Sequence, residues 1–177
     1  MTCNMKKLML PDFFQASEVP IVHKFYRNYF KDCYVCGDVD YIFGPNTAFF
    51  DHCEIHSIAR VSEEKAYITA ASTPAGQEFG LIFSHCRITG EEPDSVYLGR
   101  PWRDCAKTAF ICCELGDHIC PEGWQNWGKV RAEVLSDYIE YGNFGPGADC
   151  SGRSPLSRCL VNPEVETYFS KENVLVG

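Results

Sequence analysis

An all-β solenoid, in which short strands stack turn upon turn into parallel sheets, is the fold class that this sequence predicts. Three observations support it: a short motif recurs four times, a cysteine marks the same place in every copy, and irregular lengths of turn-rich chain separate the copies. Single strands repeated in this way are typical of solenoids, in which each repeat contacts only its neighbours.

The motif reads aromatic, two residues, cysteine, one residue, aliphatic. Its copies are residues 30–35, 50–55, 83–88 and 110–115, and their cysteines step by 20, 33 and 27 residues. Residues two apart in a strand face the same side, so each cysteine and the aliphatic residue after it should point inward. We therefore expect a core ladder of free thiols, without a disulfide or metal role, formed by Cys33, Cys53, Cys86 and Cys113.

Composition excludes several classes of function. The 177 residues suffice for one domain with a sizeable core, and 45% hydrophobic against 23% charged residues is a globular balance. A net charge of −8 without a Lys/Arg cluster argues against a nucleic-acid partner. No apolar run approaches the ~18 residues of a membrane span. The 11 cysteines are odd in number, so at least one thiol is free or paired with another molecule.

The other elements follow from strand and turn signals. Residues 1–24, broken by Pro11 and Pro20, are expected to be a divergent leader outside the regular coil, which occupies 25–177. No signal peptide is visible, because Pro11 and Asp12 end the apolar stretch that begins at Met5. Further strands are expected at 66–72, 95–100 and 138–141, separated by loops. A short helix within 162–176 is expected to cover the open end of the coil.

A zinc site is the alternative explanation for some of the cysteines. Cys33 and Cys36 have C-x-x-C spacing, and Cys112 and Cys113 lie near His118. A structural zinc site usually needs paired ligands, however, and the sequence holds no second C-x-x-C. We therefore expect no metal site.

The segment 35–44 places two carboxylates, Asp38 and Asp40, in an otherwise β-prone run. A carboxylate in such a run is costly to bury unless a charge or a hydrogen bond meets it. Either both residues lie in a solvated turn, or one of them has a cationic partner and a chemical role.

Several segments resemble pectinesterases (pectin methylesterases). They are 37–44, the Leu-Gly-Arg-Pro-Trp run at 98–102, Pro-Glu-Gly-Trp at 121–124 with Trp127, and the shorter segments 67–71 and 140–143. The likeness runs from about residue 25 to 160. It implies a right-handed parallel β-helix, no cofactor, a secreted or extracellular location, and hydrolysis of the methyl esters of pectin.

The resemblance also assigns roles to particular residues. Asp40 matches the family's nucleophile, and Arg100 matches the cation that keeps this carboxylate ionised and oriented. Trp102 and Tyr41 are the expected substrate-binding residues, with Trp102 offering a flat surface to a sugar ring. The repeat agrees with the pairing, since Asp40 and Arg100 each lie 13 residues before a motif cysteine. Equivalent places two turns apart would put their Cα atoms about 10 Å apart.

One part of the family pattern is missing. The family's acid/base aspartate lies 21 residues before the nucleophile, which here falls on Val19, preceded by Glu18. Valine cannot transfer a proton, and an anionic Glu18 cannot donate to an oxyanion; Gln15 is a weak substitute out of register. The chain is also much shorter than a full pectinesterase, so we expect it to be truncated at its N-terminus and poorly active.

Three hypotheses follow. The first is a carboxylic ester hydrolase acting through Asp40, and the second is an inactive relic or pectin-binding β-helix. The third is a polysaccharide lyase or hydrolase of the same architecture with other chemistry. The third is the weakest, because lyases of this kind use clustered carboxylates with calcium and only Asp38 and Asp40 form a close acidic pair.

Overall fold

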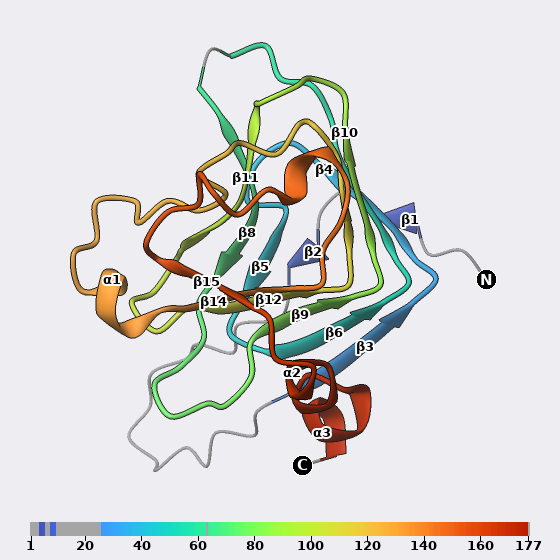
Figure 1. Ribbon diagram of the computed structural model, residues 1–177, viewed down its shortest axis with the longest axis vertical. Coiled ribbons are helices and arrows are strands. Elements are labelled where there is room, and N and C mark those ends of the chain that lie inside the picture. The colour runs from blue at the N-terminus through green and yellow to red at the C-terminus, as the bar shows by residue number, and fades with distance from the viewer. Residues whose placement is uncertain (1–3, 6–7, 10–25, 63, 177) are drawn as a thin grey trace.

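The structure is a computed structural model that describes residues 4–5, 8–9, 26–62 and 64–176. Over these residues the chain winds through three sheets, whose paired strands are all parallel (Figure 1). Sheet A runs in the spatial order β1 (Asn4–Met5), β4 (Tyr34–Gly37), β7 (Glu54–Ser57), β10 (Arg87–Gly90), β13 (Glu114–Leu115). Sheet B runs β11 (Val96–Pro101), β8 (Ala66–Ala71), β5 (Ile42–Gly44), β2 (Leu8–Met9). Sheet C runs β15 (Ser157–Leu160), β14 (Asp137–Tyr141), β12 (Lys107–Ile111), β9 (Leu81–Ser84), β6 (Thr47–Asp51), β3 (Arg27–Lys31).

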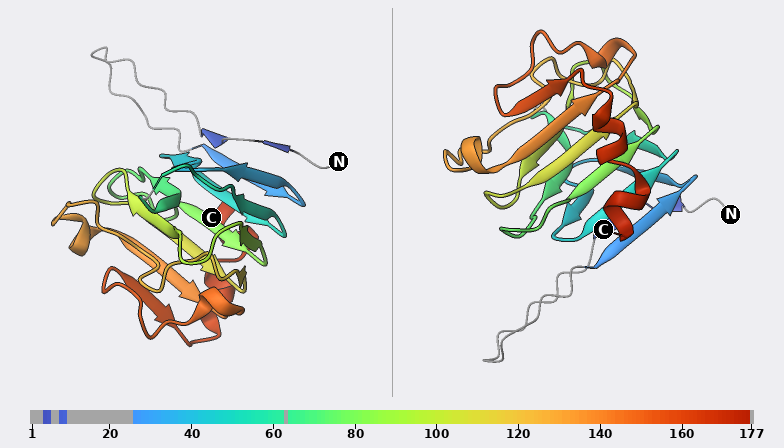
Figure 2. Two further views of the ribbon diagram at one scale, coloured as in Figure 1. Left: turned by 90° about the horizontal axis from the view of Figure 1, so that it is seen from above. Right: turned by 60° about the horizontal axis from the view of Figure 1, so that its bottom comes forward.

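Successive strands visit sheets C, A and B in turn, so that β3, β4 and β5 make one turn of the coil and β6, β7 and β8 make the next. Figure 2 shows these turns stacked along one axis. This is a parallel β-helix, the architecture that the repeat predicts.

The repeat motif builds the core of the coil. The motif phenylalanines stack face to face through the interior, with centroids 4.9, 4.7 and 4.5 Å apart along Phe30, Phe50, Phe83 and Phe110. The motif cysteines are buried, and the thiol of each donates to a backbone carbonyl; they are Cys33, Cys53, Cys86 and Cys113. The predicted thiol ladder is therefore confirmed. A separate pair, Cys150 and Cys159, forms a disulfide.

The leader does not lie wholly outside the coil. Asn4–Met5 pairs with Tyr34–Val35 in sheet A, and Leu8–Met9 pairs with Ile42–Phe43 in sheet B. These four residues continue the sheets past their first full turn, because the edges of β4 and β5 offer unpaired backbone groups. The expectation of a leader separate from the coil is thus wrong for them. Val19, Glu18 and Gln15 lie outside the described residues.

The C-terminal segment forms two helices, α2 (Glu164–Tyr168) and α3 (Lys171–Val176), rather than one. They pack on the outer face of sheet C (Figure 2). The prediction that this segment covers the open end of the coil is therefore wrong. Val165 of α2, Val174 of α3 and Phe169 between the two helices are buried and join an apolar cluster with Phe49 and other residues that point out of the sheet. The helices lie there because they bury this apolar outer face of sheet C, which would otherwise be exposed to water. A short helix, α1 (Ala132–Leu135), and a 3₁₀ turn (Pro146–Ala148) lie in the loops around β14.

Candidate active site

A paired carboxylate and guanidinium lie on the outer side of sheet B. Arg100 Nε donates to Asp40 Oδ1 at 3.0 Å, and its Nη2 donates to Oδ2 at 2.5 Å. The side chains are 16% and 17% exposed, so the pair is largely desolvated yet open to one side. A bidentate contact of this kind fixes the direction of the carboxylate as well as balancing its charge.

Backbone geometry places Asp40 at the entrance to β5. Its φ is 48°, in the left-handed region, which Asp tolerates better than most side chains. Its N–H donates to Tyr67 O at 2.7 Å, so the residue is anchored to the neighbouring strand β8. Asp38, by contrast, is exposed and accepts from the adjacent Val39 N–H. The solvated-turn alternative fits Asp38 and not Asp40.

The spacing from the motif cysteines predicted that Asp40 and Arg100 occupy equivalent places in their turns. The structure shows that they do not. Arg100 pairs with Ala70, and Ala70 pairs with Phe43, so Arg100 is level with a residue three positions beyond Asp40. The irregular turns between motif copies have different lengths, and counting back from the cysteines misses this offset. The contact forms because the long arginine side chain reaches back along the sheet.

Two aromatic rings hold the guanidinium of Arg100 in this extended conformation. Arg100 Cζ lies 4.0 Å from the ring centroid of Tyr67 and 4.5 Å from that of Trp127, within the range of cation–π attraction. The Tyr67 hydroxyl donates to Gln125 Oε1 at 2.5 Å. Burial raises the pKa of Tyr67, although Arg100 acts in the opposite direction.

Gly99 lets the strand that carries Arg100 approach its neighbours. A Cβ at this position would lie 2.1 Å from Thr69 Oγ1 and 3.1 Å from the ring of Trp124. Thr69 is itself held by donating to Leu98 O. The glycine of the Leu-Gly-Arg-Pro-Trp run is therefore a packing requirement.

Trp102 and Trp127 form an exposed aromatic surface beside the pair. They are 45% and 40% exposed, and their rings stack with centroids 5.4 Å apart. Lys129 fixes the loop by donating to Trp102 O at 2.5 Å. The structure thus brings Asp40, Arg100 and Trp102 to one surface, as the sequence analysis expected.

Tyr41 does not belong to that surface. It is 0% exposed, and its hydroxyl is hydrogen-bonded to Ser57 Oγ at 2.9 Å inside the coil. A fully buried ring has no face to offer a polysaccharide, so the expected substrate-binding role of Tyr41 is withdrawn. The position next to Asp40 suggested that role, but a residue directly after a left-handed turn continues into the strand and points inward.

Sequence reasoning missed Tyr67, Trp127 and Gln125. Tyr67 and Trp127 lie in segments that carry the family resemblance, but nothing in their spacing shows that they flank the same guanidinium. Of the residues named in the zinc alternative, Cys112 belongs to a group of three candidate ligands within the described residues, but its companions there are His85 and Glu166, not Cys33, Cys36 or His118. Within the part of the chain that the structure describes, no helix has the length and apolar character that a membrane span requires.

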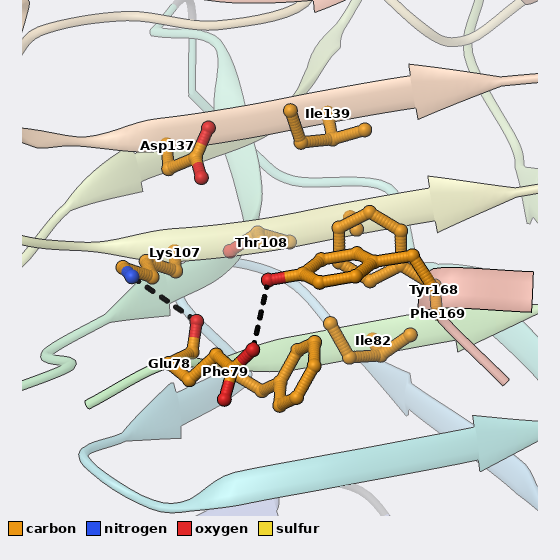
Figure 3. A pocket seen from close by; sticks show the side chains of 11 residues that line it. Glu78, Phe79, Ile82, Lys107, Thr108, Asp137, Ile139, Tyr168 and Phe169 are labelled. Carbon is orange, nitrogen blue, oxygen red and sulfur yellow. Dashed lines mark hydrogen bonds between the residues drawn. The ribbon is translucent and has the colours of Figure 1, made fainter. Parts of the chain in front are cut away.

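A pocket lies elsewhere, on sheet C beside α2 (Figure 3). It encloses about 40 Å³, and Tyr168 closes it by donating to Glu78 Oε1 at 3.1 Å. That volume holds one or two waters and no sugar.

Comparison with known proteins agrees with this geometry. A family model described as Pectinesterase matches residues 15–175. Pectinesterase 31 of Arabidopsis thaliana is 39% identical over 140 residues, which cover 78% of this chain and 43% of that protein. The pectin methylesterase from carrot superposes with a TM-score of 0.77 at 30% identity, over 85% of this chain and 50% of that one.

A pectin methylesterase solved in complex with a hexasaccharide superposes with a TM-score of 0.68 at 27% identity, over 84% of this chain and 51% of that one. The chain spans less than half of the length of the curated relatives it matches.

Proposed function

The chain belongs to the pectinesterase family, and we propose that it hydrolyses the methyl esters of pectin with Asp40 as the nucleophile. The observation that carries the proposal is the bidentate Asp40–Arg100 pair, open to solvent beside Trp102 and Trp127. The hexasaccharide bound to a related pectin methylesterase supports an oligosaccharide substrate here. Because pectin is a wall polymer, the site of action is extracellular.

The chemistry proceeds in two steps. A carboxylate oxygen of Asp40 attacks the ester carbonyl carbon, the resulting tetrahedral oxyanion collapses, and the methoxy group leaves as methanol after it gains a proton. Water then hydrolyses the anhydride between Asp40 and the sugar carboxyl, which restores the aspartate and yields a free acid. Arg100 holds the attacking oxygen in line, and its charge offsets the negative charge that develops.

The aromatic surface positions the substrate. Trp102 and Trp127 present flat, half-exposed rings on which the apolar face of a sugar can lie. Trp127 also covers the guanidinium of Arg100, so a bound sugar would exclude further water from the ion pair. Substrate binding and the strength of the catalytic pair are therefore linked through one side chain.

Turnover by this chain is proposed to be slow. The position that would hold the family's acid/base is Val19, and general acid–base catalysis is worth about 10²–10⁴-fold in rate. The leaving methoxide would have to take its proton from water. A second candidate function, pectin binding without turnover, is favoured by the same valine together with the exposed tryptophans.

Methanol release from highly methylated pectin distinguishes the two. Turnover that is lost in Asp40→Asn supports the esterase, whereas retained pectin binding without methanol release, weakened in Trp102→Ala, supports the binding protein. Activity equal to that of a family member that carries the acid/base aspartate would contradict the role given to Val19.

A further inference from the structure

A column of side chains follows the corner where sheet C passes into sheet A. Four residues there have φ between 51° and 53°, each directly before a motif cysteine: Asp32, His52, His85 and Cys112. Their left-handed backbone turns the chain, and successive turns place their side chains one above the next outside the coil. The imidazoles of His52 and His85 stack with centroids 5.2 Å apart.

Helix α2 brings a carboxylate to this column. His85 Nε2 lies 3.8 Å from Glu166 Oε1. Cys112 is on the next turn, level with His85, whose N–H donates to Ile111 O. One ligand atom from each of His85, Cys112 and Glu166 lies within 4.8 Å of the others.

We propose that His85, Cys112 and Glu166 form a zinc-binding site between the coil and α2. An imidazole nitrogen, a thiolate and a carboxylate oxygen are the donors that Zn²⁺ takes, at about 2.0–2.3 Å. Tetrahedral coordination at those lengths puts donor atoms roughly 3.3–3.8 Å apart. The imidazole–carboxylate separation of 3.8 Å is a few tenths of an ångström longer than a nitrogen–oxygen pair on zinc requires, so small side-chain rotations would close it and bring in the sulfur. A water completes the fourth position.

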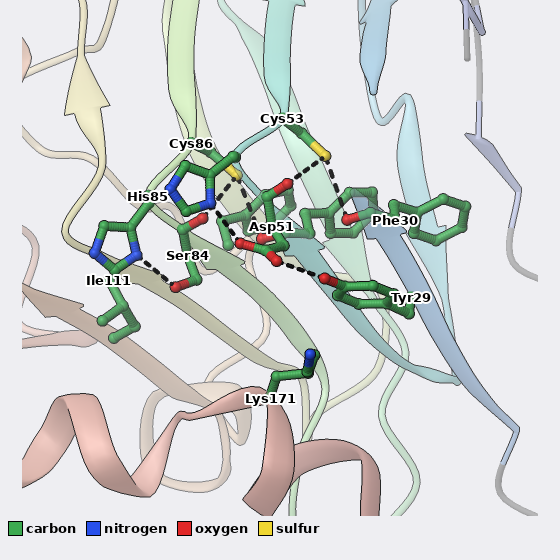
Figure 4. Close-up of polar contacts among 12 residues, drawn as sticks. Tyr29, Phe30, Asp51, Cys53, Ser84, His85, Cys86, Ile111 and Lys171 are labelled. Atoms are coloured by element: carbon green, nitrogen blue, oxygen red, sulfur yellow. Dashed lines mark hydrogen bonds and ion pairs between the residues drawn. The ribbon is translucent and has the colours of Figure 1, made fainter. Parts of the chain in front are cut away.

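The surroundings of His85 suit the role of a ligand. Its Nδ1 is hydrogen-bonded to Ser84 Oγ at 2.9 Å (Figure 4). When Nδ1–H is the donor, Nε2 carries the free lone pair and faces Glu166, which is the outer-shell arrangement common to metal-binding histidines. The side chains of His85 and Glu166 are 41% and 52% exposed, so an ion can enter from solvent.

Cys112 would bind as the thiolate. Burial, and secondarily the charge of Glu166, raises the pKa of its thiol, and a bound cation would oppose both effects. Binding therefore replaces the thiol proton, which passes to solvent, with a sulfur–zinc bond. It follows that affinity falls as the pH is lowered.

Two other groups of candidate ligands among the described residues are less suitable. In the group of Asp94, Cys120 and Glu122, Lys65 Nζ already lies 2.8 Å from Asp94 Oδ1 and supplies the cation. In the group around Glu140, both cysteines are joined in a disulfide. The corner site alone of the three combines a free thiol with a histidine.

Titration of the purified chain with Co²⁺, a spectroscopic substitute for zinc, tests the proposal. We expect one equivalent of Co²⁺ to bind and to give a thiolate-to-cobalt charge-transfer band. Zn²⁺ should displace the Co²⁺ and remove the band. Cys112→Ser and His85→Ala should abolish the band. Their matched controls, Cys36→Ser, another half-buried free cysteine, and His52→Ala, the histidine one turn earlier, should retain it.

Two further measurements guard against misfolded variants. Ser84→Ala, which leaves all three ligands in place, should weaken binding by about 10- to 100-fold. Zn²⁺ should raise the melting temperature of the unsubstituted chain and not that of Cys112→Ser. Absence of a thiolate band, a band that survives Cys112→Ser, or equal loss in His52→Ala and His85→Ala would overturn the proposed ligand set.

Discussion

Arg100 donates hydrogen bonds to both carboxylate oxygens of Asp40 across an intervening strand, although the two residues are three positions out of register. The offset makes the contact depend on the full length of the arginine and on the rings of Tyr67 and Trp127 that enclose it. The proposed nucleophile is thus oriented by a side chain that is itself held by packing.

Replacing Arg100 with lysine should lower kcat/KM by roughly 10²-fold, the scale expected when a reacting group is misplaced by about 1 Å. Lysine keeps the charge but loses the bidentate fork and most of the stacking. Steady-state methanol release measures the effect. Arg87→Lys, in an exposed pair with Glu54, is the control and should behave like the unsubstituted chain. Equal rates for Arg100→Lys and the control would contradict the orienting role.

Trp102→Ala should weaken pectin binding by about two- to tenfold, which corresponds to the loss of one aromatic contact. Because it is the ring of Trp127 that lies over the guanidinium of Arg100, truncating Trp102 should change kcat little while KM rises. Val134→Ala, which trims another exposed apolar side chain, provides the comparison. A fall in kcat at constant KM would mean that Trp102 serves the pair and not the sugar.

The repeat predicts the coil because stacking is a local property. An inward cysteine and the aliphatic residue two positions later fix which face of each strand is buried, so the Cys33 to Cys113 ladder and the stacking of parallel strands follow from spacing alone. The resemblance supplies the Asp40–Arg100 pair. The three-residue offset does not follow, since it depends on the length of each irregular turn.

Contacts made by loops and by the C-terminal helices were also beyond reach of the sequence. The ring of Trp127 covers Arg100 only because its loop folds back over sheet B. The proposed zinc ligands His85, Cys112 and Glu166 come from three distant segments and follow no motif spacing. The apolar outer face of sheet C, which binds α2 and α3, is spread over several strands.

Glu140→Gln should destabilise the fold by about 3–5 kcal/mol, because it leaves a buried guanidinium without its anion. Glu140 and Arg153 form a bidentate pair with side chains 1% and 4% exposed, and Trp124 Nε1 donates to the same carboxylate. Urea unfolding measures the loss. The surface variant Glu54→Gln should cost less than about 1 kcal/mol, and an equal cost for both would contradict the structural role.

His118 should make stability fall as the pH is lowered from about 6.5 to about 4. The imidazole is 1% exposed, and burial lowers its pKa from 6.5 to about 4. In that window the unfolded chain binds a proton that the folded chain does not, so unfolding becomes easier by up to about 3 kcal/mol. The slope should flatten below pH 4.

The matched substitution is His118→Leu, which removes the titrating group from the same apolar space. Its unfolding free energy, measured in urea at several pH values, should vary less between pH 6.5 and 4. The pKa values of Asp51 and Asp94 are lowered from 3.8, that of Asp94 chiefly by the hydrogen bond from Lys65. The stability that these two carboxylates contribute is therefore lost in a more acidic pH range than the one set by His118. An unchanged slope in His118→Leu would assign the effect to other groups.

The most direct test of the proposed mechanism compares methanol release from highly methylated pectin by the unsubstituted chain and by Asp40→Asn, with Asp38→Asn as the matched control. We predict slow release by the unsubstituted chain, about 10²–10⁴-fold below a family member that carries the acid/base aspartate. Asp38→Asn should equal it, and Asp40→Asn should release none above background. Equal release by Asp40→Asn and the unsubstituted chain would contradict the assignment of Asp40 as the nucleophile.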